Sequence, residues 1–327
     1  MSVLIKYIFH NDDYGFFVEE SKRIIRCITD GVVNSVSVMG NSKCLPECIK
    51  MVKDSNPNLS VNAASDEINP NRSTKDEIGG QVLVAVHLNI VDGIALSEPS
   101  DVGMLTDLNG VFVPNFGKML IMSYIPVVRG KLKRELKREI SKQIANVMQY
   151  MKDDTVLDST EEVVRLDSHL HYHQLPVMFD ALMEVIKEED LKVSYIRMPR
   201  EKTSLYRKAH QKIKPINMVK AIVLNVLCFR NSVKYRKELS SYEKRLFLGV
   251  CQSGNMTYDV VSSLWPFAKK WADKHGCGIE ILNHPGGVKE AEDLKKVTFQ
   301  GDYKAFTSPL RDEEGETWIK MRSWECL

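Results

Sequence analysis

Seven short apolar segments, separated by segments with helical periodicity, restrict the fold of this chain more than any other feature. Strands that alternate with helices form parallel βαβ units, so we expect an α/β fold with a parallel sheet. The 327 residues suffice for one large α/β domain, and we expect a single domain over 1–327. The expected strands cover residues 3–9, 32–39, 81–90, 161–173, 191–197, 246–250 and 278–282.

Polar side chains that can carry chemistry follow several of these strands. Asp12 and Asp13 come after the first strand, His87 and Asn89 end the third, Arg197 ends the fifth, and His284 follows the seventh. In a (β/α) barrel the carboxyl ends of the strands meet at one mouth, where active sites lie. Paired aspartates are often only a helix cap or a solvated turn, but this position favours a site.

The fourth strand carries the densest group of titratable side chains. Asp167, His169, His171 and His173 stand at alternate positions, so a continuous strand would point all four to one face. One such histidine is usually a packing residue. Three titratable rings buried beside an aspartate are costly unless something binds them, so we predict a metal or catalytic site here.

Two imidazoles and a carboxylate leave open positions on a divalent ion for water and substrate. Such an ion lowers the pKa of bound water and polarises a carbonyl group, which suits amide or ester hydrolysis. The sequence has no glycine-rich phosphate fingerprint before a helix and no Gly-x-Ser-x-Gly elbow. Residue chemistry alone therefore predicts a metal-dependent hydrolase on a barrel-like α/β fold.

Composition bears on partners and compartment. The net charge of +2 suggests neither nucleic acid nor membrane as a partner, and the longest apolar run, 221–229, is too short to span a bilayer. The seven cysteines are odd in number and scattered, and the first residues lack a signal-peptide pattern. We expect a reduced, cytoplasmic protein.

Two further segments stand outside the strand–helix alternation. Residues 54–80 are rich in Asn, Ser, Asp and Pro and are expected to form a surface loop. Residues 201–242 are basic and helical in pattern, and we interpret them as an insertion. This insertion either encloses the substrate or forms an outer helical layer with a solvated basic face, and the sequence does not separate the two interpretations.

The same motifs resemble a known family. His-Asn-Asp-Asp-Tyr-Gly at 10–15 is similar to the Asn-Ala-Asp-Asp-Phe-Gly motif of the YdjC-like (ChbG) carbohydrate deacetylases. The departures are His10 and Asn11, together with a lengthened loop before His87. The resemblance continues, in order and spacing, through Ser-Val-Ser-Val-Met (35–39), Val-His-Leu-Asn (86–89), Asp-Ser-His-Leu-His-Tyr-His (167–173), Ile-Arg-Met-Pro (196–199) and Glu-Ile-Leu-Asn-His-Pro-Gly (280–286).

The resemblance implies a distorted, seven-stranded (β/α) barrel that removes acetyl groups from N-acetylated sugars such as chitooligosaccharides. By family position, one divalent ion, Mg or Zn, is expected on Asp13, His87 and His169. Asp12 is the expected base and His284 the expected acid. The residues expected to contact the substrate or to orient the site are Arg197, His171, His173 and Asn89.

Two other functions remain possible interpretations of the sequence. The first is metal-assisted hydrolysis of another sugar ester, a phosphoester or a glycosidic bond. Glycosidases need two carboxyl groups that flank the bond, and Asp12 with Asp167 meets that count. The second is a sugar-binding protein without activity, although binding alone does not call for an acidic pair beside histidines. The expected partner is a small carbohydrate, with a homodimer as an option.

Overall fold

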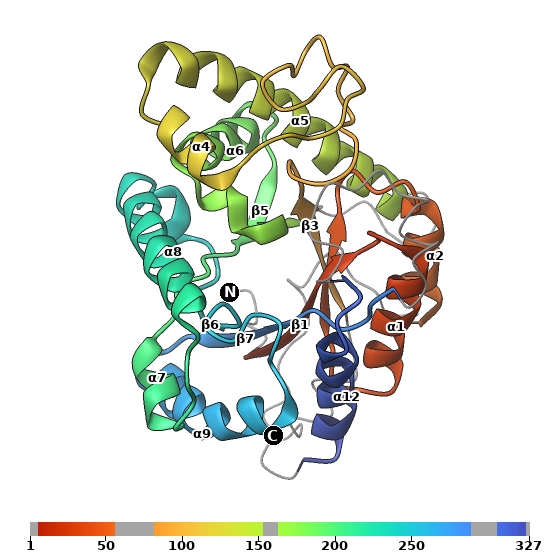
Figure 1. The fold of residues 1–327 in the computed structure, drawn as a ribbon, viewed down its shortest axis with the longest axis vertical. Coiled ribbons are helices and arrows are strands. Elements are labelled where there is room, and N and C mark those ends of the chain that lie inside the picture. The colour runs from red at the N-terminus through yellow and green to blue at the C-terminus, as the bar shows by residue number, and fades with distance from the viewer. Residues whose placement is uncertain (1–5, 56–81, 153–162, 289–305, 325–327) are drawn as a thin grey trace.

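The computed structural model describes residues 6–55, 82–152, 163–288 and 306–324, and its strands form one parallel sheet. The sheet order is β5-β4-β3-β2-β1-β7-β6, and every pair of neighbours is parallel. Figure 1 shows the sheet curled into an incomplete barrel, which confirms the expected fold. The strands are β1 (Tyr7–Tyr14), β2 (Ser35–Met39), β3 (Leu83–Leu88), β4 (Val163–Ser168), β5 (Lys192–Ile196), β6 (Arg245–Leu248) and β7 (Gly278–Asn283).

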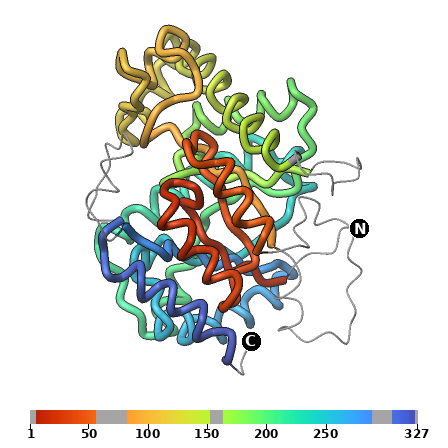
Figure 2. The backbone as a smooth tube through the Cα atoms, turned by 90° about the vertical axis from the view of Figure 1, so that its right-hand side faces the viewer, coloured from red at the N-terminus to blue at the C-terminus, as the bar shows by residue number. Residues whose placement is uncertain are grey.

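Helices cover the outside of the sheet (Figure 1). Figure 2 shows α1, α2 and α12 along one flank, where α1 contacts both of the others. The helices are α1 (Val18–Thr29), α2 (Leu45–Ser55), α4 (Phe116–Met122), α5 (Pro126–Lys152), α6 (Pro176–Glu188), α7 (Thr203–Lys208), α8 (Pro215–Lys234), α9 (Tyr258–His275) and α12 (Leu310–Arg322), with short 3-10 turns η1 (His169–Gln174) and η2 (Glu238–Ser240).

The central strands are buried on both faces because helices cover the outside and side chains fill the inside. Every residue of β1, β2, β3 and β7 is buried, as expected for parallel strands in an α/β protein. Phe9 of β1 packs against Trp265 of α9 and Trp318 of α12 on the outside of the barrel. This packing fixes α12, which supplies groups to the site described below.

The two edges of the sheet are β5 and β6, and side-chain and loop contacts join them. The backbone N–H of Glu243, just before β6, donates to Ser194 O in β5 at 3.0 Å. The carboxylate of Glu243 also binds Arg165 of β4, with Nη1 to Oε1 at 2.6 Å. The segment 201–242, which contains α7, α8 and η2, connects these two edges.

Several boundaries differ from the sequence-based expectation. β1 continues to Tyr14 instead of ending at Phe9, because a bulge keeps the polar residues within the strand. β4 ends at Ser168, so the histidine run does not continue as a strand. The start of the predicted 54–80 loop belongs to α2, which ends at Ser55, and residues 56–80 lie outside the described residues.

Candidate active site

A β-bulge in β1 turns two consecutive aspartates toward the same cavity. The register between β1 and β2 shifts between Asn11 and Tyr14, and Asp13 has a left-handed backbone with φ of 64°. Asn11 faces outward, where Trp318 Nε1 donates to its Oδ1 at 2.7 Å. In a regular strand Asp13 would share that outward face, but the bulge rotates it inward beside Asp12. Such strain is typical of functional sites.

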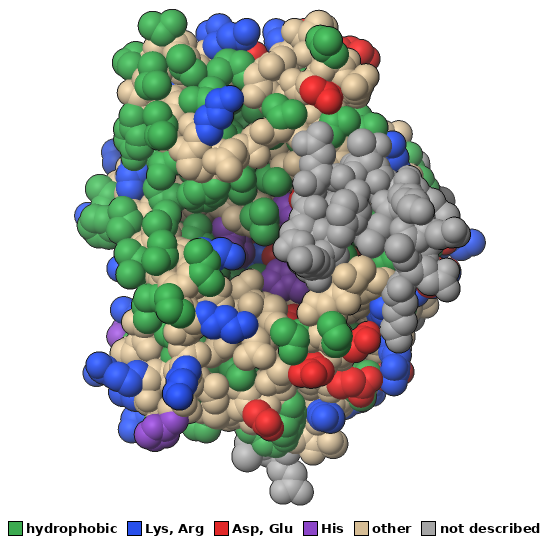
Figure 3. All heavy atoms as spheres, in the orientation of Figure 1, with side chains coloured by type: hydrophobic (Ala, Val, Ile, Leu, Met, Phe, Trp, Pro, Cys, Tyr) green, Lys and Arg blue, Asp and Glu red, His purple; other side chains and the backbone are tan. Residues whose placement is uncertain are grey.

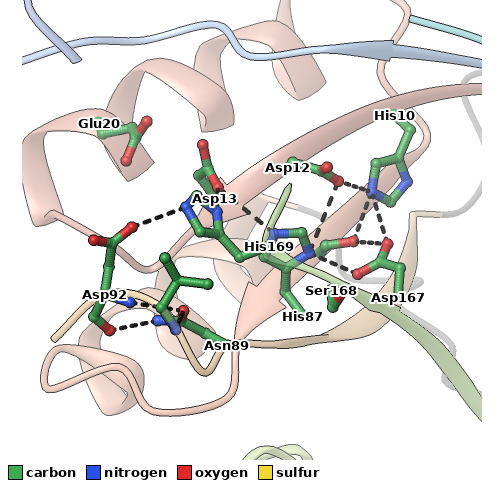
Figure 4. Close-up of polar contacts among 12 residues, drawn as sticks. His10, Asp12, Asp13, Glu20, His87, Asn89, Asp92, Asp167, Ser168 and His169 are labelled. Atoms are coloured by element: carbon green, nitrogen blue, oxygen red, sulfur yellow. Dashed lines mark hydrogen bonds and ion pairs between the residues drawn. The ribbon is translucent and has the colours of Figure 1, made fainter. Parts of the chain in front are cut away.

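Asp13, His87 and His169 form a buried cluster in which one ligand atom from each lies within 4.8 Å of the others. Asp13 Oδ1 lies 2.8 Å from His169 Nδ1 and 3.6 Å from His87 Nε2. Figure 4 shows the three side chains converging from β1, β3 and the start of η1. These are the three residues that the sequence analysis expected to hold a metal.

The cluster fits a divalent ion. His87 Nε2 is buried and has no hydrogen-bond partner among the described residues, although it points toward Asp13. The other ring nitrogen, Nδ1, lies 2.6 Å from Asp167 Oδ1. One nitrogen of His87 is therefore held by a carboxylate, and the other is directed at a carboxylate and a second imidazole. This arrangement is common among histidines that bind metals.

Asp92 orients the second histidine of the cluster, a role that the sequence analysis missed. Its Oδ2 lies 3.0 Å from His169 Nε2. Asn89 holds the turn that carries Asp92, because its side-chain oxygen accepts from the backbone N–H groups of Val91 and Asp92 at 2.9 and 3.1 Å. Asn89 therefore shapes the site through Asp92, and its side chain lines a separate cavity of about 310 Å³.

The C-terminal helix also reaches the cluster. Arg311 of α12 binds the second oxygen of Asp13, with Nη2 to Oδ2 at 3.2 Å, and also pairs with Glu20 of α1. Burial raises the pKa of Asp13, but His169, His87 and Arg311 together hold it well below its usual range. Burial raises the pKa of Glu20 well above its usual range, despite the opposing charge of Arg311.

A second buried cluster surrounds the guanidinium of Arg197, which follows β5. Its Nη1 donates to both oxygens of Asp12 at 2.8 and 2.9 Å, its Nη2 lies 2.8 Å from Asp167 Oδ2, and its Nε donates to Glu280 Oε1 at 2.7 Å. His10, Asp12 and Asp167 also have the spacing of a metal site. Because the guanidinium already supplies a cation there, this second set is the weaker candidate for a metal site.

Arg197 keeps the carboxylates around it ionised. Burial raises the pKa of Asp12, but Arg197, His87 and His10 hold it well below its usual range. Burial also raises the pKa of Asp167, and Arg197 with His87 brings it to about 2. Arg197 was expected to contact substrate. Its side chain is instead fully buried, and its guanidinium nitrogens face protein carboxylates, so it positions Asp12.

The 3-10 turn η1 separates the histidines that a continuous strand would have aligned. Leu170 and His171 have left-handed backbones, with φ of 51° and 58°. His173 points into the protein, where its ring nitrogens lie 2.6 Å from Ser168 Oγ and 2.7 Å from Arg197 O. The prediction that the histidines share one face of a strand is therefore wrong, because β4 ends before the histidines begin. His173 links β4 to β5 instead of facing the cavity.

A cavity of about 790 Å³ opens over the cluster of Asp13, His87 and His169. Figure 3 shows histidine side chains at the bottom of a hollow in the centre of the molecule. His171 lines this cavity, and its buried Nδ1 has no partner within the described structure. Burial and the nearby Arg197 hold the pKa of His171 well below its usual range, so the ring is neutral. Other lining residues include Asp12, Asp13, His169, His284, Phe116, Val219 and Leu224.

His284 stands at the cavity on a tight turn after β7. Gly286 has φ of 77°, and a Cβ there would meet the backbone oxygen of Glu20 at 2.9 Å, so only glycine fits without a shift. Glu314 of α12 accepts from the backbone N–H of His284 at 2.7 Å, and its Oε2 lies 4.0 Å from His284 Nδ1. The turn and α12 thus hold a partly exposed imidazole at the cavity wall.

Comparison with known proteins identifies the family. The sequence model described as YdjC-like protein matches residues 6–313. This chain belongs to the YdjC-like family. A carbohydrate deacetylase from Thermoanaerobacter pseudethanolicus is 22% identical over 199 residues, which are 61% of this chain and 64% of that protein. The chain thus matches just under two thirds of that relative's length.

A solved structure supports the same fold for this YdjC-like chain. The crystal structure of a putative cellobiose-phosphate cleavage protein from Enterococcus faecalis V583 superposes with a TM-score of 0.55. The superposition covers 96% of this chain and 90% of the other, at 14% sequence identity. At that sequence identity, the similarity supports a shared fold and nothing further.

Proposed function

We propose that this YdjC-like protein is a metal-dependent hydrolase that removes the acetyl group from an N-acetylated carbohydrate. The observation that carries the proposal is the unpaired His87 Nε2, directed at Asp13 and His169 below a cavity that Asp12 and His284 also line. The carbohydrate deacetylase relative supports the reaction type.

Asp13, His87 and His169 would hold one divalent ion. When bound there, such an ion would polarise the acetamide carbonyl and acidify an attacking water. Two imidazoles and one carboxylate favour zinc over magnesium, because magnesium prefers an all-oxygen set. Asp167 and Asp92 would keep the two imidazoles in the tautomers that metal binding needs.

Asp12 is the proposed general base. Its carboxylate lies beside the cluster and lines the cavity, and Arg197 keeps it ionised and oriented. A proton taken from the attacking water would move to a carboxylate oxygen that already accepts from the guanidinium. Asp13 is unsuited to this role because its oxygens face His169, His87 and Arg311.

His284 is the proposed general acid. Cleavage of an amide leaves a poor amine leaving group, which must receive a proton as the C–N bond breaks. The imidazole of His284 lines the same cavity as Asp12, and its Nδ1 lies 4.0 Å from the carboxylate of Glu314, which faces the ring from α12. The neutral His171, with its unpaired Nδ1, is the proposed contact for a sugar hydroxyl or the acetamide group.

Release of acetate tests the proposal. Purified protein incubated with N-acetylglucosamine oligomers should release acetate, and a chelator should stop the release until a divalent ion is restored. Release of shorter sugars without acetate would support glycosidic cleavage instead. That alternative is disfavoured because one guanidinium clamps both Asp12 and Asp167, and Asp167 is almost fully buried.

A further inference from the structure

Helix α8 presents an apolar face to the outside of the molecule. Ile216, Val219, Ile222, Val226, Phe229 and Val233 are each between 54% and 61% exposed, and we call these six side chains the α8 stripe. Their spacing of three or four residues places them along one side of the helix. Figure 3 shows hydrophobic side chains gathered on the side of the molecule that α8 forms. Contiguous exposed apolar surface of this kind marks an interaction site.

The opposite face of α8 is attached to the barrel. Asn231 Nδ2 donates to the backbone oxygen of Gln174 at 3.0 Å, and Asn225 exchanges hydrogen bonds with the backbone of Glu201. In the described part of the chain, α8 is the one helix with the length and hydropathy to cross a membrane, but a third of that window is buried against the protein. A helix bound along its inner face can lie on a surface but cannot cross a bilayer.

The charge around α8 identifies what the stripe can dock on. Between residues 202 and 237 there is no Asp or Glu, whereas the whole chain has a net charge of only +2. A twofold contact between two copies would place each basic segment against or beside its own counterpart. Two of the segment's ten basic residues, Arg230 and Lys234, pair with Asp180 of α6. The other eight are Lys202, Arg207, Lys208, Lys212, Lys214, Lys220, Arg236 and Lys237.

The basic segment and the apolar stripe together match an anionic lipid surface. Apolar side chains that enter the acyl boundary beside Lys and Arg that meet the headgroups are the pattern of an interfacial helix. Exposed lysines flank the stripe on both sides, with Lys212 and Lys214 before it and Lys237 after it. Each basic residue near such a surface adds attraction that salt screens.

The stripe continues into the cavity of the proposed active site. Val219 belongs to both, and Lys220, Val223 and Leu224 of the same helix also line the cavity. A surface docked through the stripe would therefore lie at the cavity mouth.

We propose that the α8 stripe docks on an anionic lipid surface and that the cavity accepts an N-acetylated sugar carried on a lipid in that surface. The second part rests on the proposed deacetylase function, and the first does not. The apolar wall of α8 would cover the part of the lipid next to the sugar, while Asp12 and the metal cluster would face the acetamide. This proposal revises the expectation, drawn from the net charge alone, that the protein has no membrane partner.

Vesicle sedimentation of the full chain tests the docking. The protein should sediment with phosphatidylcholine vesicles that contain phosphatidylglycerol, less with phosphatidylcholine alone, and less as salt rises. The variant Val226→Gln/Phe229→Gln should bind about tenfold or more weakly, since both changes remove apolar contacts. Leu108→Gln, which changes an almost fully exposed apolar residue far along the chain from α8, is the matched control and should bind like wild type.

Three results would overturn the docking. The first is equal sedimentation of wild type and the double variant with anionic vesicles, and the second is no binding of the wild type even at low salt. The third is a wild-type dimer by light scattering that the double variant converts to a monomer, since a second copy of the chain would then cover the stripe. Folding of the double variant is checked by its thermal melting profile.

Activity separates the two parts of the proposal. Wild type should deacetylate an N-acetylglucosaminyl lipid in anionic vesicles, and the double variant should lose most of that kcat/KM while it keeps its rate on a soluble N-acetylglucosamine oligomer. Equal loss on both substrates would contradict the docking role.

Hydrolysis of the soluble oligomer without vesicle binding would overturn the inference and leave the proposed function standing. Vesicle binding without release of acetate from either substrate would overturn the deacetylase function and leave the docking supported.

Discussion

Arg197 binds both carboxylate oxygens of Asp12 through a single nitrogen, with Nη1 to Oδ1 at 2.8 Å and to Oδ2 at 2.9 Å. The guanidinium approaches from the carboxyl end of β5, while Asp12 lies on β1 across the barrel. The same guanidinium holds Asp167 and Glu280, so three buried acids share one cation. Because Asp167 in turn holds His87, this arginine links the proposed base to the proposed metal cluster of Asp13, His87 and His169.

Substitution Arg197→Lys should lower activity at least about 100-fold, because one ammonium cannot reproduce the planar contacts to three carboxylates. The uncompensated acids should also lower the free energy of unfolding by about 3–5 kcal/mol. Steady-state kinetics and denaturant unfolding measure the two effects. Lys274→Gln, at the exposed end of α9, should leave both unchanged, and wild-type kinetics in Arg197→Lys would remove Arg197 from the positioning role.

Substitution His87→Ala should abolish stoichiometric metal binding, since it removes one of the three proposed ligands, with its unpaired Nε2. Metal analysis of the purified variant beside wild type is the measurement. His275→Ala, a change at an exposed histidine of α9, serves as the control and should retain the metal. Equal metal content in His87→Ala and wild type would take His87 out of the ligand set.

Substitution Asp92→Asn should weaken metal binding by about 10–100-fold, because the amide no longer holds His169 Nε2 as the carboxylate does. Titration with zinc and a competing chelator would give the affinity. The exposed Asp101 offers a matched control, Asp101→Asn, with an unchanged affinity. An Asp92→Asn affinity equal to that of wild type would reduce Asp92 to a packing residue.

Substitution His284→Ala should lower kcat on an N-acetylated sugar more than on an activated acetate ester. The amine needs a proton when it leaves, whereas the alcohol of an activated ester does not. The ratio of the two losses is the measurement, and the metal content should stay at the wild-type level. Equal losses on amide and ester would exclude the acid role.

Asp180 of α6 anchors α8 and should make stability depend on pH. It pairs with Arg129, Arg230 and Lys234, and although burial raises the pKa of Asp180, Lys234, Tyr235 and Arg230 bring it below its usual value. A lowered folded-state pKa contributes stability above the unfolded pKa of about 4, and this contribution is lost as pH falls through the folded value.

Asp180→Asn should therefore cost about 1–2 kcal/mol of unfolding free energy at pH 7 and progressively less below pH about 4. Urea unfolding of wild type and variant, at pH 7 and below pH about 4, is the measurement. A cost that stays the same at low pH would mean that packing, not charge, explains the effect.

The sequence predicted the fold because its signals were local. Buried parallel strands need continuous apolar runs, and these runs stand out at residues 81–90, 191–197 and 278–282 without any knowledge of the fold. The proposed ligands Asp13, His87 and His169 could also be named in advance, since each stands on or just after a predicted strand and lies in a motif that resembles the family. The structure brings these three side chains into one buried cluster.

Other parts of the site depend on contacts between distant segments, which a single sequence does not record. Asp92 and Arg311 carry no motif, and each enters the site only because a turn or a terminal helix packs against the barrel. The sequence also did not predict which way a side chain points where the backbone departs from regular strand geometry.

The sequence by itself determined the alternation of strands and helices, the family, and the residue types at the strand ends. Only the tertiary structure decided which of those residues face the cavity. A bulge at Asp13 turned a second aspartate inward, and the early end of β4 directed His173 into the protein and left His171 at the cavity. The physical reason is that apolar periodicity specifies regular elements, whereas bulges, left-handed turns and buried charge networks are stabilised by partners far away in the chain.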